Sequence, residues 1–422
     1  MGVLVVGVAL YLAEICAGYS VLTHEEIVDR LWESRIQAIL VERFPSATAE
    51  ELGRAHAFAY GGCLIQDMGY YRFGNRTFSD LTHYVRSGAF VAALIQESST
   101  LEEYAFALGA LAHYASDNTG HPTVNRVVAL QFPKLRARYG NEVRYADHRR
   151  SHIRSEFGFD VVQVAKNRYT SDDYRDFIGF EVSREVMERA FVRTYGIELT
   201  DVFSDLEMAI GTYRWAITEL IPEMTRVALA SYHDEIAQAI PNVDEQQFAY
   251  RMSRADFEQE WGRRYKRPGF LARTLAFVMK IVPKVGPFSA LKVEIPNAHT
   301  EQMYLESVDE TLKIYDSLLL QASRGDVDFP NLDFDTGRPT QAGEYPLADS
   351  AYAKLLDELA ENNFKRVTPQ LQKDILQFYG DLQASIATKK KEKDWRRTVE
   401  QLEKLKAYQP LPPEPSYATE TN

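Results

Sequence analysis

The chain has 422 residues, of which 45% are hydrophobic and 26% are charged, as in ordinary globular proteins. This length predicts two or three domains, each large enough to bury a core. The net charge of −12 argues against a general nucleic-acid scaffold, because phosphate contacts depend on Lys and Arg. It does not exclude an enzyme that handles phosphate through metal ions.

The first 18 residues are apolar apart from Glu14. The run is short for a membrane span and is typical of a secretory signal peptide that is cleaved after Gly18. An uncleaved anchor is the alternative, since no Lys or Arg precedes the apolar run. The signal peptide predicts an exported protein, periplasmic or extracellular, whose mature chain starts at Tyr19 and keeps Cys63 as its sole cysteine.

Helical periodicity dominates the rest of the chain and predicts an all-α protein. In the segment 23–44, Thr23 is a candidate N-cap, with Glu26 three residues later. Strand-like alternation is scarce. The clearest further helical segments are 100–117, 351–364 and 368–386.

Breaks in this pattern suggest how the chain is organised. The stretch 238–247 is a candidate boundary between a domain at 19–245 and a helical C-terminal region at 246–410. Within that region, residues 324–346 form a long loop rich in Asp, Gly and Pro. It contains "DFDTG", which lacks the rest of a calcium-loop motif. The tail at 411–422 is predicted to be disordered.

One basic stretch stands out in this acidic chain. Residues 261–292 hold eight Lys or Arg residues and no Asp or Glu, mixed with large apolar side chains. This combination is typical of a segment that lies on an anionic membrane surface. The alternative, slightly favoured, is an amphipathic helix that packs on the preceding domain.

Histidines cluster in the first part of the chain. Seven of the nine lie between His24 and His152, and zinc sites need several neutral imidazoles together with carboxylates. In "HYASDNTGHP", His113, Asp117 and His121 are four residues apart, which places them on one stripe of a helix. For a single His–Asp pair, a stripe that faces water is the simpler interpretation. Several such pieces together favour a metal site.

The order of these pieces resembles the zinc-dependent phospholipase C family, whose fold is shared with single-strand-specific zinc nucleases. The resemblance covers roughly residues 19–245. It rests on His24, Asp67, His83, "HYASD", His121 and a His-x-x-x-Glu pair at His152 and Glu156. It implies an all-α domain with about three zinc ions in one cleft.

Position by position, the resemblance implies three sets of ligands. One zinc would be held by Asp67, His83, His113 and Asp117, and a second by His121, His152 and Glu156. The third would be held by His24, by Asp117, which bridges two ions, and by the backbone amino group and carbonyl of Tyr19.

This sequence departs from the family pattern at two positions. Tyr19 stands where family members usually have tryptophan. Three residues, not five, separate Asp117 from His121. His148 is an alternative ligand to His152, since the two share a helix face; the acidic partner Glu156 favours His152.

The resemblance implies hydrolysis of a phosphodiester by metal-activated water, with Asp67 as the candidate general base. Phospholipids are the expected substrate, and no stable nucleic-acid partner is expected. A nuclease of the same fold is the first alternative. It is disfavoured by the acidic net charge and by Glu156, where nucleases tend to carry aspartate. A metal-stabilised binding protein without turnover is the second alternative. The sequence does not indicate an oligomeric state.

Overall fold

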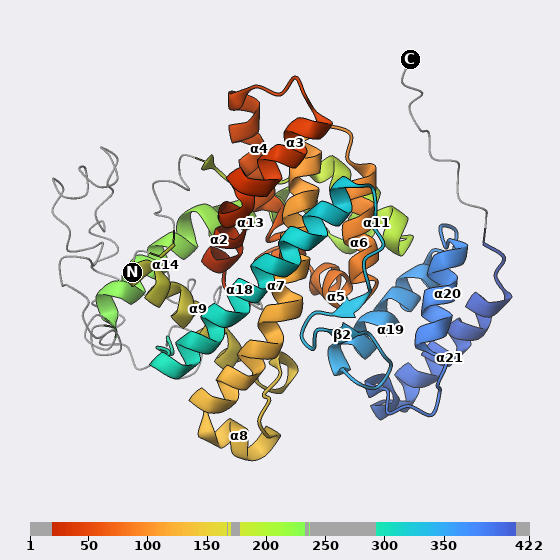
Figure 1. Cartoon of the computed structure of the whole chain (residues 1–422). Coiled ribbons are helices and arrows are strands. Elements are labelled where there is room, and N and C mark those ends of the chain that lie inside the picture. Colours follow the sequence, from red (N-terminus) through yellow and green to blue (C-terminus); the bar gives the residue numbers. More distant parts are fainter. Residues whose placement is uncertain (1–18, 167, 170–177, 233–235, 237–292, 411–422) are drawn as a thin grey trace, which may run out of the picture.

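The computed structural model describes residues 19–166, 168–169, 178–232, 236 and 293–410 (Figure 1). The predicted signal peptide, the candidate boundary at 238–247, the basic stretch 261–292 and the tail 411–422 lie outside these ranges. The described residues are almost entirely helical, which confirms the predicted all-α class. Among the helices in these ranges, none is both long enough and apolar enough to cross a membrane.

The first half of the chain supplies a long central helix and the shorter helices around it. In chain order they are α2 (Val21–Leu31), η1 (Trp32–Ile36), α3 (Gln37–Arg43), α4 (Ala49–Gly62), η2 (Ile65–Tyr70), α5 (Arg76–Tyr84), α6 (Ser87–Glu97), α7 (Leu101–Gln131), α8 (Pro133–Tyr139), α9 (Tyr145–Ala165), α11 (Arg184–Tyr195), α12 (Leu199–Val202), α13 (Leu206–Trp215), η3 (Ala216–Leu220) and α14 (Ile221–Ser231).

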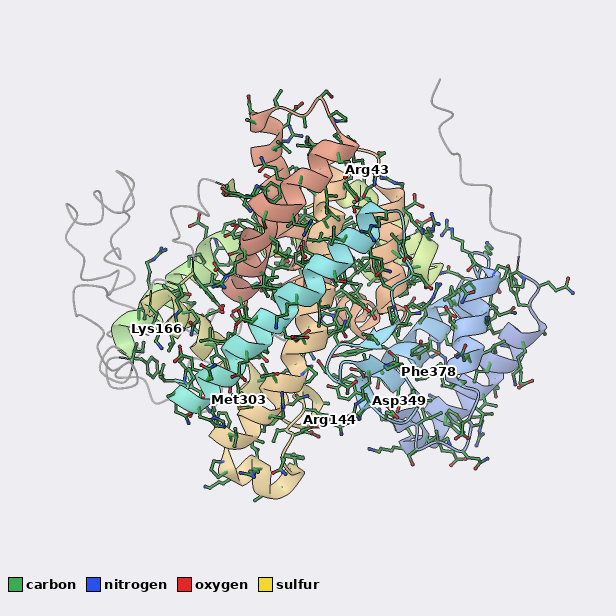
Figure 2. All side chains as sticks on the ribbon, viewed as in Figure 1. Arg43, Arg144, Lys166, Met303, Asp349 and Phe378 are labelled. Carbon is green, nitrogen blue, oxygen red and sulfur yellow. The ribbon has the colours of Figure 1, made fainter. Side chains whose placement is uncertain are left out.

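The C-terminal part adds one long helix, a small hairpin and a group of shorter helices. These elements are α18 (Ala298–Ser323), β1 (Leu332–Asp333), β2 (Arg338–Pro339), α19 (Pro346–Glu361), α20 (Pro369–Phe378), η6 (Ala387–Lys390) and α21 (Glu392–Ala407). Helix α18 runs alongside α7, and α19, α20 and α21 gather at one side (Figure 1). Asp349 and Phe378 mark this group among the side chains of Figure 2.

Helix α7 is the axis of the core, and its contact with α4 is unusually close. A Cβ atom added to Gly109 would lie 2.1 Å from the carbonyl oxygen of Ala59, and one added to Gly62 would lie 1.9 Å from that of Phe106. Glycine at both positions therefore lets the two backbones touch. The chain that follows α4 is consequently held against the middle of α7.

The predicted start of the first helix was wrong. Helix α2 begins at Val21 with Ser20 as its N-cap, so Thr23 lies inside the helix. The Thr23 hydroxyl instead donates a hydrogen bond to Asp160 Oδ1 at 2.7 Å, and both side chains are buried. The Thr23 side chain, which the sequence suggested as an N-cap, thus makes a tertiary contact with α9.

Candidate metal centre

Helix α7 brings His113, Asp117 and His121 together on one buried stripe. The relative exposure of all three side chains is 0%. The alternative that this stripe faces water is therefore wrong. The Nε2 atoms of His113 and His121 lie 3.2 and 3.4 Å from Asp117 Oδ2, one turn away on either side.

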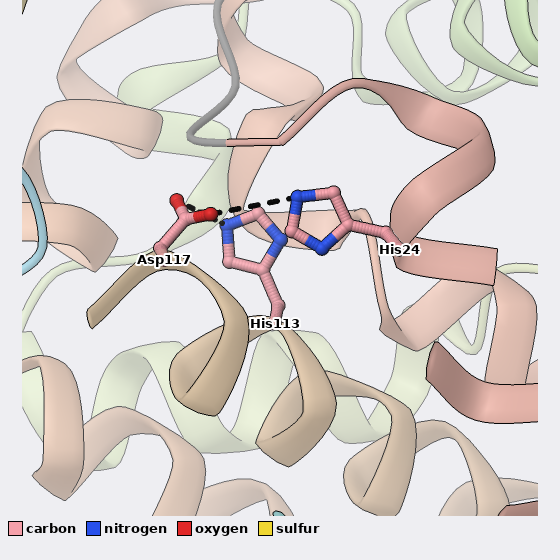
Figure 3. A group of neighbouring side chains, drawn as sticks. All are labelled: His24, His113 and Asp117. Atoms are coloured by element: carbon pink, nitrogen blue, oxygen red, sulfur yellow. Dashed lines mark ion pairs between the residues drawn. The ribbon is translucent and has the colours of Figure 1, made fainter. Parts of the chain in front are cut away.

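Three shorter elements bring further side chains to the same stripe. His24 comes from α2, Asp67 from η2 and His83 from α5, and all three are buried. His24 Nε2 lies 3.4 Å from Asp117 Oδ1, and Figure 3 shows this imidazole converging with His113 on the carboxylate. His83 Nε2 lies 3.3 Å from Asp67 Oδ1 and 3.4 Å from Asp117 Oδ2.

Helix α9 contributes two further side chains to the site, His152 and Glu156. His152 Nδ1 lies 3.3 Å from Glu156 Oε1, and the pair forms a group with His121 whose donor atoms are close enough to share one ion. Two further groups meet this criterion, namely His24 with His113 and Asp117, and Asp67 with His83 and His113. The structure therefore gathers every predicted side-chain ligand into three neighbouring groups.

Backbone carbonyls hold three of the imidazoles in one tautomer and orientation. Nδ1–H of His83 donates to the carbonyl of Ser79 at 2.8 Å, and Nδ1–H of His113 donates to that of Cys63 at 2.9 Å. His152 uses Nε2–H to reach the carbonyl of Val143 at 2.6 Å. In each ring the other nitrogen points to the centre and presents a lone pair once it carries no proton, which is how protein scaffolds orient metal-binding histidines.

The spacing of the donor atoms fits shared metal ions better than direct hydrogen bonds. All the His–carboxylate pairs of the centre are 3.2 to 3.4 Å apart. Charge-assisted hydrogen bonds are shorter, about 2.7–2.9 Å. Two atoms bonded to one tetrahedral zinc at about 2.0–2.1 Å lie about 3.3–3.4 Å from each other.

The same atoms are buried and lack other partners. Such atoms are costly unless something compensates them, and a cation would satisfy several at once. Within the described ranges, the atoms of the centre that make no hydrogen bond are both ring nitrogens of His24 and His121, Nε2 of His83 and His113, and both carboxylate oxygens of Asp67 and Asp117.

Burial and mutual charge shift the pKa values of the centre in opposite directions. Burial lowers the pKa of His24 to about 3 and that of His152 to about 4. Burial also opposes the protonation of His83, but the nearby carboxylates of Asp117 and Asp67 outweigh it and raise its pKa to about 10. Burial raises the pKa of Glu156 well above its usual range. Protons held in the metal-free centre must therefore leave when cations bind.

Tyr19 lies against the centre, as its predicted role requires. Its ring packs across Gly120, where an added Cβ would lie 2.7 Å from the ring, and its centroid is 6.1 Å from that of His24. The Tyr19 hydroxyl donates to Ser307 Oγ in α18 at 2.7 Å. This hydrogen bond gives a tyrosine a specific fit at the position. That its backbone binds an ion stays a prediction.

Two nearby histidines do not join the groups. His148 is half-buried, and its Nδ1 forms a hydrogen bond with the Ser151 hydroxyl at 2.9 Å. Its non-helical backbone, with φ −156° and ψ 74°, separates it from the helix face of His152. His56 stacks on Trp32 with the ring centroids 3.9 Å apart. The structure thus favours His152 over His148.

Sequence reasoning missed one acidic residue of the centre. Asp335, at the turn between β1 and β2, is buried, and its Oδ1 lies 3.2 Å from His121 Nε2. It belongs to the "DFDTG" segment, which was notable only for a faint likeness to a calcium loop. The sequence therefore marked this acidic segment, but it did not predict that Asp335 contacts His121 in α7.

The fold and the site together define an all-α protein with a buried centre of His, Asp and Glu side chains suited to several metal ions. Residues 23–205 match the model of the zinc-dependent phospholipase C family, which confirms the predicted resemblance. The match includes every predicted side-chain ligand and excludes Tyr19 and Asp335. No curated protein and no solved structure matches the chain.

Proposed function

We propose that this protein is an exported zinc-dependent phosphodiester hydrolase that acts as a phospholipase C on phospholipids. One observation carries the proposal. Within the segment that matches the family model, buried His and carboxylate donors from α2, η2, α5, α7 and α9 converge at 3.2 to 3.4 Å. Donors of these types at this spacing are suited to zinc.

The proposed number of about three zinc ions is supported by the three groups of donors. Asp117 is central, because its two oxygens face His24 on one side and His83, His113 and His121 on the other. It is therefore our candidate for a carboxylate that bridges two ions. The amino group and carbonyl of Tyr19 would complete the group of His24.

When bound, zinc neutralises phosphoryl oxygens, lowers the pKa of water and stabilises the leaving oxygen. The protein must then accept the proton of the attacking water. Asp67 is suited to this role, since Oδ1 faces His83 while Oδ2 has no hydrogen-bond partner among the described residues.

The proposal includes contact of the basic stretch 261–292 with the substrate membrane, and an amphipathic helix packed on the preceding domain is the alternative. This stretch lies outside the described residues. Attraction to an anionic surface is about 1 kcal/mol per basic side chain and weakens with salt. Changing Arg263, Arg264, Lys266 and Arg267 to Gln is expected to reduce co-sedimentation with anionic vesicles. Unchanged binding by this variant, or binding that ignores salt, would contradict the membrane role.

The function is tested by offering the purified mature protein three substrates: phosphatidylcholine in mixed micelles, a chromogenic phosphodiester and single-stranded DNA. We expect release of a phosphorylated head group and diacylglycerol, lost on chelation and restored by zinc. The control is Asp67→Asn, which is expected to lower turnover while the protein stays folded. Preferential cleavage of DNA would instead identify a nuclease. Zinc binding without turnover on any substrate would identify a binding protein.

A further inference from the structure

The turn between β1 and β2 reaches from the C-terminal part of the chain into the metal centre. The two strands pair antiparallel, with Leu332 opposite Pro339 and Asp333 opposite Arg338. The turn is closed by the hydrogen bond from the Gly337 N–H to the Asp333 carbonyl at 2.8 Å. Phe334 and Asp335, at the tip, are both fully buried.

Several contacts fix this turn on the elements that carry the candidate ligands. The Phe334 N–H donates to the carbonyl of His83 at 3.2 Å, and the Phe334 ring lies 5.2 Å from the His83 ring. Asn125 Nδ2, in α7, donates to the backbone carbonyl of Asp335 at 3.0 Å. Gly337 has a φ of +65°, and a Cβ there would lie 2.6 Å from the Asn118 carbonyl, so glycine permits the close approach.

The two carboxylate oxygens of Asp335 have different surroundings. Oδ2 accepts hydrogen bonds from the hydroxyls of Tyr84, at 3.0 Å, and Tyr345. Oδ1 receives no hydrogen bond from any part of the chain that the structure describes, and it points to His121 Nε2 at 3.2 Å. One oxygen is thus held in place by two donors, while the other faces the centre.

We propose that Asp335 is a further protein ligand of the metal centre and that its Oδ1 binds the ion shared by His121, His152 and Glu156. The two tyrosine hydroxyls orient this carboxylate, as outer hydrogen-bond donors commonly orient metal-binding carboxylates. Because Asp335 lies outside residues 23–205, the metal centre of this protein is completed by chain beyond the family segment.

A simple ion pair between Asp335 and a protonated His121 is the competing explanation. Its expected N⁺–H···O⁻ distance is about 2.7–2.9 Å with hydrogen-bond geometry. The observed pair is longer, makes no hydrogen bond and matches the spacing of the other candidate ligand pairs, 3.2 to 3.4 Å. His121 also has Asp117 as a neighbour, so a second carboxylate is not needed merely to hold its charge.

The test measures metal binding and not turnover, although the inference rests on the zinc centre of the proposed function. Metal-free full-length mature protein is titrated with zinc and, separately, with cobalt(II), whose visible absorption reports its ligands. Asp335→Ala is expected to lower the affinity for one ion at least 100-fold and to change the visible absorption band of cobalt at that site. The remaining ions are expected to bind as before. The matched control is Asp333→Asn, because Asp333 is buried on the same hairpin but caps the turn through the Thr336 N–H at 3.1 Å.

A folded Asp335→Ala protein with full zinc content, unchanged affinity and an unchanged cobalt spectrum would overturn the proposal. If Asp335→Ala does not fold, Tyr345→Phe keeps the carboxylate and removes one donor to Oδ2. This variant is expected to bind the same number of ions but to have an affinity for that one ion about tenfold lower. An unchanged affinity would equally overturn the proposal. The two proposals fail separately. Zinc binding that depends on Asp335 without turnover would refute only the enzyme, and turnover with Asp335-independent zinc binding would refute only this ligand.

Discussion

The close contact between α4 and α7 offers a sharp test, because it positions a candidate ligand as well as the core. In Gly109→Ala, the new Cβ would start 2.1 Å from the Ala59 carbonyl oxygen and 2.9 Å from the Cys63 nitrogen. Ordinary contact begins at 3.4 Å, so the helices must separate by roughly 1 Å. Both neighbours are backbone atoms and cannot rotate away. We therefore expect the free energy of unfolding to fall by about 3 kcal/mol, at the upper end of the usual range for overpacking.

Such a loss corresponds to a fall in Tm of about 6–12 °C for a domain of this class, measured by differential scanning calorimetry. The separation would also move the Cys63 carbonyl away from His113 Nδ1, now 2.9 Å apart, and weaken zinc binding about 10–100-fold. The control is Gly53→Ala in the same helix α4, where an added Cβ meets nothing within 4 Å. It should raise stability by about 0.5–1 kcal/mol. Equal melting temperatures and zinc affinities for the two variants would refute the reasoning.

Three further predictions concern the ligands. Asp117→Asn should lower the zinc content by about two ions and Glu156→Gln by about one, by elemental analysis, because Asp117 faces donors of more than one group whereas Glu156 belongs to a single group. An unchanged zinc content in Asp117→Asn would contradict the bridging role. His148→Ala should keep its full zinc content while His152→Ala loses about one ion, and the reverse result would reassign the ligand. A form that retains methionine before Tyr19 should lose most of its turnover relative to the exported protein, because an amide is a poor metal donor; equal turnover would rule out the amino-terminal ligand.

The sequence was most informative where local spacing decides geometry. The four-residue spacing of His113, Asp117 and His121 places them on one stripe in any regular helix, and α7 is regular there. The same periodicity was sufficient for the all-α class. The burial of the stripe was not readable, since it depends on α2, η2, α5 and α9, which bring their side chains against α7 from elsewhere in the sequence.

Features set by long-range contact were missed or misassigned. Thr23 resembles an N-cap in sequence, but its hydroxyl is used by Asp160, far along the chain. Asp335 reaches His121 only because Gly337 lets the hairpin approach α7. The unusual backbone at His148 likewise removes a face that an ideal helix would share with His152. The periodic pattern of apolar residues does not predict such contacts.

The central claim is that the buried His, Asp and Glu side chains form a zinc centre. The most direct measurement is an anomalous difference map from crystals of the mature protein, with data collected on both sides of the zinc absorption edge. The account predicts about three zinc peaks, each within about 2.0–2.2 Å of the donor atoms of one group, with Asp117 between two of them. Zinc peaks only at the protein surface, or none in crystals grown with zinc, would contradict it.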